Sequence, residues 1–324
     1  MNTKIKYIKI SSKYLIGALI LAAGLSSAVF GLDQDPEGYY QIKTGDDLFE
    51  FAQKVNGGET TIKGRLMNDI TIDENVKIND NGELETVGIR EWTPIGTQNN
   101  PFNGEFISDQ VKSINGLYIN SDNDNVGLFG VVGENGKIND VRLVNSYIKG
   151  RYDVGGIAGR NRGTIDGCWT GFVIVKGVHH VGGNVGLNFG TLNNILSSGI
   201  NVEGKAFVGG NVGENHGTIS GDRDHLTGTI ISGSDVKISG DRFVGGNVGM
   251  ICASVRGKLI NKGKISGDSS VGGNVGFNYN DYIVNITAEA NLTNTGKVIV
   301  GGEEIIENNN IGYNKRCQST INIW

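Results

Sequence analysis

Short apolar runs alternate with polar positions along most of the chain, and glycines separate the runs. The segments FVIVKG, INVEG and DVKISG place apolar side chains at every second position, which is typical of half-buried β-strands. A helical repeat is disfavoured, because each glycine inside a helix costs about 1 kcal/mol relative to alanine. The pattern therefore predicts short strands joined by tight bends.

The pattern also repeats at a nearly constant interval. The triplet Val-Gly-Gly begins at Val154, Val181, Val208, Val244, Val271 and Val300, and a variant begins at Val126. Successive intervals are 28, 27, 27, 36, 27 and 29 residues, so one unit carries an insertion of nine. A unit of this length fits one coil of a right-handed parallel β-helix, with coils stacked about 4.8 Å apart. The predicted class is an all-β solenoid.

A helix is expected before the first coil. Thr44 followed by Asp47 forms an approximate capping box, and Gly57-Gly58 would end the helix. Its apolar face would contain Leu48, Phe51, Ala52 and Val55 and would cover the open edge of the first coil. The expected order is an N-terminal cap over 32–66, irregular first coils over 67–125, regular repeats over 126–302, and a C-terminal tail or cap over 303–324.

The first 31 residues have the three parts of a signal peptide. A basic start precedes the apolar stretch YLIGALILAA, and small residues follow, with cleavage expected after Ala28 or Gly31. The apolar stretch is shorter than the roughly 20 residues that a spanning helix needs. We expect an exported chain, secreted or at the cell surface, with no transmembrane span after cleavage.

Composition narrows the class of protein. Glycine accounts for 52 of 324 residues while proline accounts for 3, which excludes collagen. Hydrophobic residues make up 38% and charged residues 19%, which disfavours general disorder. Without the four lysines of the leader, 25 basic residues face 34 acidic ones, so a nucleic-acid partner is not expected.

The repeats resemble the GLUG motif of bacterial surface proteins. The resemblance lies in VGGIAGRNRGTI (154–165), VGGNVGLNFGTL (181–192), VGGNVGENHGTI (208–219) and VGGNVGFN (271–278), and it covers about residues 40–302. It implies an exported β-solenoid of adhesin-like proteins, or of the non-catalytic region of bacterial immunoglobulin A peptidases, without catalytic residues. The segment 251–255 departs from the motif, because it lacks the asparagine and glycine.

No enzyme motif is found. A zinc peptidase needs two histidines four residues apart on a helix, and His179, His180, His216 and His225 lack that setting. A polysaccharide-active β-helix enzyme is the alternative, and its candidate acids and base are Asp222, Asp224, His225, Asp235 and Asp241. SGDR occurs at both 220–223 and 239–242, which favours ordinary turn residues. A fragment of a larger surface protein is the third reading.

Metal and cofactor sites are not predicted either. The segment SDNDN (121–125) is rich in oxygen ligands, but Gly133 stands where a helix–loop–helix calcium site needs an acidic residue. The three cysteines Cys168, Cys252 and Cys317 lie far apart and on different repeat phases, so they predict no disulfide framework. Small buried thiols are the expected role.

Two columns of equivalent residues are candidates for a special role. The residue before each core valine is Asp153, His180, Phe207, Phe243 or Ser270. Strand alternation would turn His180, Phe207 and Phe243 outward as an exposed ladder that stacks on sugar rings or partner side chains, or that only stabilises the coil. Asn184, Asn211, Asn247 and Asn274 are expected to form a structural ladder of stacked amides.

Taken together, these observations predict a non-enzymatic β-solenoid with a role in adhesion or in cell-envelope structure. Its expected partners are glycans, or proteins on the surface of a host or a neighbouring cell. No cofactor is expected.

Overall fold

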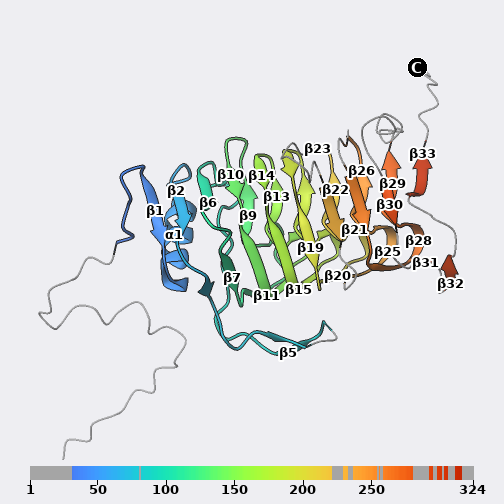
Figure 1. The fold of residues 1–324 in the computed structure, drawn as a ribbon, viewed down its shortest axis with the longest axis horizontal. Coiled ribbons are helices and arrows are strands. Elements are labelled where there is room, and N and C mark those ends of the chain that lie inside the picture. Colours follow the sequence, from blue (N-terminus) through green and yellow to red (C-terminus); the bar gives the residue numbers. More distant parts are fainter. Residues whose placement is uncertain are drawn as a thin grey trace, which may run out of the picture. The chain divides into compact units, whose positions relative to one another are not determined.

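The computed structural model describes residues 31–79, 82–220, 229–232, 236–253, 255, 258–279, 292–294, 298–300, 303–305 and 311–315. Residues 1–31 and 32–324 form two separate units. The expected signal peptide lies outside the described residues, apart from Gly31. The second unit is built from stacked parallel strands (Figure 1).

Three parallel sheets run along the stack of coils. The first contains β1 (Tyr39–Ile42), β2 (Lys63–Leu66), β6 (Glu105–Ser108), β10 (Lys137–Asn139), β14 (Thr164–Asp166), β18 (Thr191–Asn193) and β23 (Thr218–Ser220). The third contains β9 (Phe129–Val132), β13 (Ala158–Asn161), β17 (Val185–Asn188), β22 (Val212–Asn215), β26 (Val248–Ile251), β29 (Val275–Tyr279) and β33 (Ile311–Lys315). Each coil adds one strand to each of these sheets.

The second sheet is longer, because each coil usually adds two or three strand segments to it. These are β3 (Ile70–Thr71), β7 (Ser113–Asn115), β8 (Tyr118–Asn120), β11 (Arg142–Lys149), β12 (Tyr152–Gly155), β15 (Trp169–Lys176), β16 (His179–Gly182), β19 (Leu196–Ser198), β20 (Asn201–Glu203) and β21 (Ala206–Gly209). It continues with β24 (Thr229–Ser232), β25 (Lys237–Gly245), β27 (Lys258–Asn261), β28 (Lys264–Gly272), β30 (Leu292–Asn294) and β31 (Val298–Val300). Two antiparallel additions are β32 (Glu303–Ile305), on β31, and the separate hairpin β4 (Lys77–Ile78) with β5 (Leu84–Thr86).

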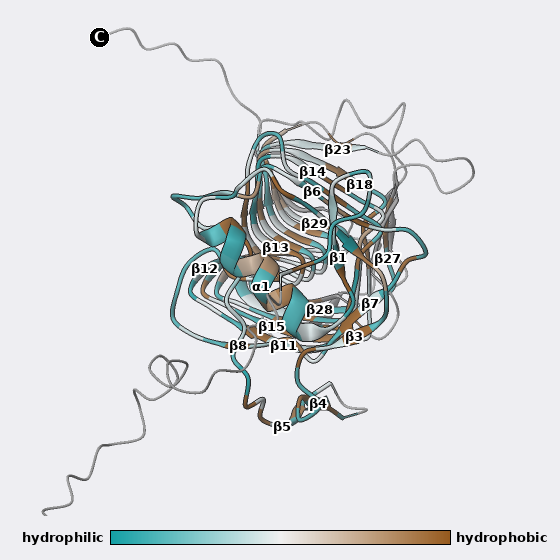
Figure 2. Ribbon diagram, turned by 90° about the vertical axis from the view of Figure 1, so that its left-hand side faces the viewer, coloured by the Kyte–Doolittle hydropathy of each residue, from teal (hydrophilic) through white to brown (hydrophobic). Residues whose placement is uncertain are grey.

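The register between coils follows the repeat in the sequence. Val154 lies opposite Val181, which lies opposite Val208, and the same alignment continues through Val244 to Val271. These valines are at most 1% exposed and form one continuous core with the isoleucines and leucines of the other sheets (Figure 2). The prediction of a parallel β-solenoid with coils of about 27 residues is confirmed.

The helix α1 (Gly45–Asn56) lies across the first coils, as the sequence predicts (Figure 2). The Thr44 hydroxyl accepts a hydrogen bond from the Asp47 amide, and the Asp47 carboxylate accepts one from the Thr44 amide, which completes the capping box. Phe51 is fully buried and makes edge-on contacts with Phe102 and Phe106. The helix thus closes the core with aromatic side chains.

Candidate functional site

The residue before each core valine has a backbone conformation that simple strand alternation does not foresee. Asp153, His180, Phe207, Phe243 and Ser270 all have positive φ, between 51° and 56°. A left-handed residue interrupts the alternation of side chains. These side chains, called here the corner column, pack against the third sheet. His180, Phe207 and Phe243 are therefore half-buried, and the expectation of a fully exposed ladder is wrong.

Rings from consecutive coils nevertheless form a continuous series, which we call the aromatic stripe. Its members are Tyr152, His179, Phe207, Phe243, Phe277 and Tyr279, and their successive ring centroids lie 5.4, 6.2, 5.1, 4.9 and 6.3 Å apart. His180 adds a further ring, 5.2 Å from that of Phe207. The stripe ends in two more exposed tyrosines, Tyr152 at 38% and Tyr279 at 37%.

Positively charged side chains accompany the stripe. The Arg151 guanidinium lies 4.7 Å from the centre of the Tyr152 ring, and that of Arg242 lies 5.7 Å from the centre of Phe243. Arg151 also pairs with Asp124 at 2.9 Å. Aromatic faces with neighbouring cations stack well on sugar rings and can hold polar or acidic substituents beside them.

A network of charged side chains lies under the first part of the stripe. Asp153 is 2% exposed and accepts hydrogen bonds from Arg160 and from His180, whose Nδ1 lies 2.7 Å from Oδ1. The Nε2 atom of His180 lies 3.0 Å from Glu214 on β22 of the next coil. His216 contacts the other oxygen of Glu214, with Nε2 at 2.5 Å. The network thus links the second and third sheets across three coils.

The network controls the protonation of its members. Burial alone lowers the pKa of His180, but the hydrogen bonds and negative charges of Glu214 and Asp153 outweigh burial and raise this pKa to about 9. Burial raises the pKa of Glu214, and the contacts with His180 and His216 outweigh it and lower that pKa below its usual value. The imidazolium of His180 and the two carboxylates therefore stabilise one another at neutral pH.

We expect the stability of the solenoid to fall as pH rises from about 6.5 to about 9. His180 has a folded-state pKa above its model value of 6.5, so its contribution is complete below that value and is lost as pH passes the folded pKa of about 9. The loss is on the order of 1–3 kcal/mol. Urea unfolding at pH 6 and pH 9.5 measures it. In His180→Phe, which copies the next coil, this share of the pH dependence should disappear; an unchanged difference would contradict the assignment.

The asparagines after Val-Gly-Gly form a buried column at the turn into the third sheet. The Asn184 amide donates to Asn211 at 2.8 Å, Asn211 donates to Asn247 at 2.9 Å, and Asn247 donates to Asn274 at 2.6 Å. A second amide column, of Asn161, Asn188 and Asn215, runs along the end of the third sheet with distances of 2.8 and 2.6 Å. All these side chains are buried, so their place in the structure is internal.

The residues considered for polysaccharide cleavage are largely out of view. Asp222, Asp224, His225 and Asp235 lie outside the described residues, and Asp241 is an exposed residue of β25. The segment 121–125 lies at the edge of a pocket of about 780 Å³ whose lining also includes Glu91 and Trp92. Asp124 in this segment pairs with Arg151, and Asn125 has a positive φ of 57° at the start of the corner column.

Two of the cysteines lie in the described part of the chain, and both are free. Cys168 is completely buried, whereas Cys252 is half-buried and lies beside Glu214 and His216. Cys317 lies outside the described residues. The proximity of Cys252 was missed at the sequence level. The available signal was the interval of 36 residues between His216 and Cys252, which equals the long repeat.

Comparisons with known proteins bear on the fold. No family model matches the chain. A crystal structure of a Bacteroides ovatus protein named a "putative immunoglobulin A1 protease" is similar with a TM-score of 0.58 and 18% identity, covering 87% of this chain and 86% of that one. This likeness shows the fold alone.

A second similarity is local. A "Putative Gly-rich membrane protein" of Evansella cellulosilytica is 40% identical over 79 residues, which are 23% of this chain and 9% of the relative. The matching segment thus spans less than a tenth of that relative. Among the residues described here, no helix is long and apolar enough to cross a membrane.

Proposed function

We propose that the chain is an exported, cell-surface β-solenoid of the GLUG-motif type, and that it binds glycans along the aromatic stripe without cleaving them. The observation that carries the proposal is the unbroken series of rings over consecutive coils, with Arg151 and Arg242 beside it. Because sheet strands stack at about 4.8 Å, such a stripe offers an extended ligand several equivalent contacts.

Three observations support this reading. The leader-like first 31 residues favour export, and the repeats resemble a motif of surface proteins. The rings at the two ends of the stripe are more than a third exposed. The carboxylates under the stripe are engaged by Arg160, His180 and His216, which leaves them poorly placed as acid and base for glycan hydrolysis.

The test is an array of neutral and acidic glycans, with host-matrix proteins included, probed with residues 32–324. The double variant Phe207→Ala/Phe243→Ala should bind its glycan about 5–100-fold more weakly, because each aromatic stack contributes about 0.5–1.5 kcal/mol. Tyr152→Ala/Tyr279→Ala removes only the more exposed end rings and should weaken binding in the same direction. Circular dichroism and thermal unfolding show whether the variants remain folded.

The matched control is Phe172→Ala. Phe172 is 55% exposed and has positive φ, but it lies on β15, on a different segment of the second sheet. Its removal should leave glycan binding unchanged. Equal binding by wild type and both stripe variants would exclude the stripe as the site. Binding only to matrix proteins would replace the glycan by a protein partner, and cleaved glycan spots would favour the polysaccharide-active enzyme.

A further inference from the structure

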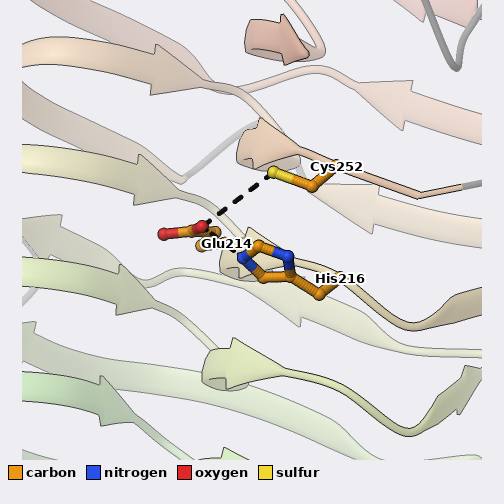
Figure 3. Close-up of side chains that lie close together, drawn as sticks. All are labelled: Glu214, His216 and Cys252. Carbon is orange, nitrogen blue, oxygen red and sulfur yellow. Dashed lines mark hydrogen bonds and ion pairs between the residues drawn. The ribbon is translucent and has the colours of Figure 1, made fainter. Parts of the chain in front are cut away.

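Three side chains with metal-binding atoms meet at the outer end of the third sheet (Figure 3). Glu214 is in β22, His216 follows this strand, and Cys252 follows β26 on the next coil. The parallel register aligns Asn215 with Ile251, so the residues that follow, His216 and Cys252, lie side by side on adjacent coils. The Cys252 amide donates to the Asn215 carbonyl at 2.8 Å, which fixes this alignment.

The ligand atoms of the three side chains converge. The Nε2 atom of His216 lies 2.5 Å from Oε1 of Glu214, and Sγ of Cys252 lies 4.0 Å from the same oxygen. All three ligand atoms lie within 4.8 Å of one another. Imidazole nitrogen, thiolate sulfur and carboxylate oxygen are the donors that zinc takes in proteins, and three protein ligands leave its fourth position open.

We propose that Glu214, His216 and Cys252 bind a divalent transition metal of the zinc class, with a solvent or ligand molecule in the fourth position. At zinc bond lengths, tetrahedral ligand atoms lie about 3.5 Å apart. His216 must move back by about 1 Å and Cys252 must approach by a few tenths of an ångström. His216 is 36% exposed in its side chain and lies after the end of its strand, so this adjustment does not disturb the core.

Neighbouring groups already orient two of the three ligands. His180 lies with Nε2 3.0 Å from the second oxygen of Glu214, which directs the first oxygen toward His216 and Cys252. Phe189 stacks on the imidazole of His216, with ring centroids 5.1 Å apart and planes inclined by 18°. Outer contacts of this kind set the orientation of metal ligands and are part of a working site.

Metal binding must displace protons. Burial and the nearby charge of Glu214 raise the pKa of the Cys252 thiol to about 12, so the free protein holds S–H. When the sulfur–metal bond forms, this proton passes to solvent. The proton between His216 Nε2 and Glu214 leaves as well or moves to Nδ1, so that Nε2 can bind the metal. Affinity should therefore fall as pH is lowered.

The test uses the reduced, metal-stripped mature chain titrated with Co²⁺ and then with Zn²⁺. We expect a thiolate-to-cobalt absorption band that saturates at one metal per chain and disappears when Zn²⁺ displaces Co²⁺. Cys252→Ser should abolish the band. His216→Ala and Glu214→Gln should weaken cobalt binding at least tenfold, and Zn²⁺ should raise the Tm of the wild type but not of Cys252→Ser.

The matched control is Cys317→Ser, which removes another thiol and should keep the band. Circular dichroism shows that each variant is folded; His216→Ala alters a side chain outside the core and serves where Glu214→Gln is unstable. A wild type without the thiolate band would overturn the proposal. So would a band that persists in Cys252→Ser, or one that depends on Cys317.

Discussion

Replacing Gly209 by alanine is expected to destabilise the solenoid by about 3 kcal/mol or more, because an added methyl group meets only backbone. A Cβ at this position would lie 2.8 Å from the Gly249 nitrogen and from the Asn247 carbonyl oxygen, and closer still to the carbonyl of Val212. None of these atoms can rotate away. The turn between β21 and β22 would have to open, and the contact with the next coil would weaken.

Urea unfolding followed by circular dichroism measures this effect. Hydrogen exchange should locate it, with faster exchange of amides in β21 and β26, because coils of a solenoid are stabilised mainly by their neighbours. Lys205→Ala, at an exposed position four residues earlier in the same coil, is the control and should change stability by less than about 0.5 kcal/mol. Equal stability of the two variants would contradict the backbone-contact argument.

Asn211→Ala should cost about 2–5 kcal/mol, because it removes two buried hydrogen bonds at once. The Asn211 side chain is completely buried; its oxygen accepts from Asn184 at 2.8 Å and its nitrogen donates to Asn247 at 2.9 Å. The variant leaves a cavity in the amide column and takes a partner from the amides on both sides. The ladder is interrupted in its middle, so both neighbouring coils are affected.

The same unfolding measurement tests this expectation. Asn135→Ala is the matched control, because Asn135 is an exposed asparagine and should contribute less than about 0.5 kcal/mol. A loss of stability no larger than that of the control would mean that the amide ladder does not stabilise the folded state. A loss confined to exchange of amides near Asn184 and Asn247 would instead measure how far the effect spreads.

Much of the fold could be predicted from the sequence, because a repeating structure repeats its constraints. The valines at 27-residue spacing indicated stacked coils, and the pairing of Val154, Val181 and Val208 confirms that register. Thr44 and Asp47 indicated the start of the helix, since a capping box is a local pattern with few alternatives. These features depend on neighbours in sequence or on equal positions in successive units.

The candidate sites could be predicted only in part. Phe207 and Phe243 share a repeat position, so their proximity followed from the period. Phe277 joins the same stripe from a different strand, and its contact with Phe243 at 4.9 Å depends on the angle between the second and third sheets. The same holds for His180 and Glu214. A repeat period aligns equal positions, but it does not determine how two strands of one coil meet.

The long coil has a consequence for engineering. Nine extra residues separate the Val-Gly-Gly triplets at Val208 and Val244, yet these valines are paired in the same register as those of the shorter coils. The extra residues lie between β23 and β25, where the chain passes from the first sheet to the second. The same passage in other coils, such as Asp166 to Trp169, is therefore a place to graft foreign peptides. A set of such grafts would display epitopes at a regular spacing on a scaffold whose core is unaltered.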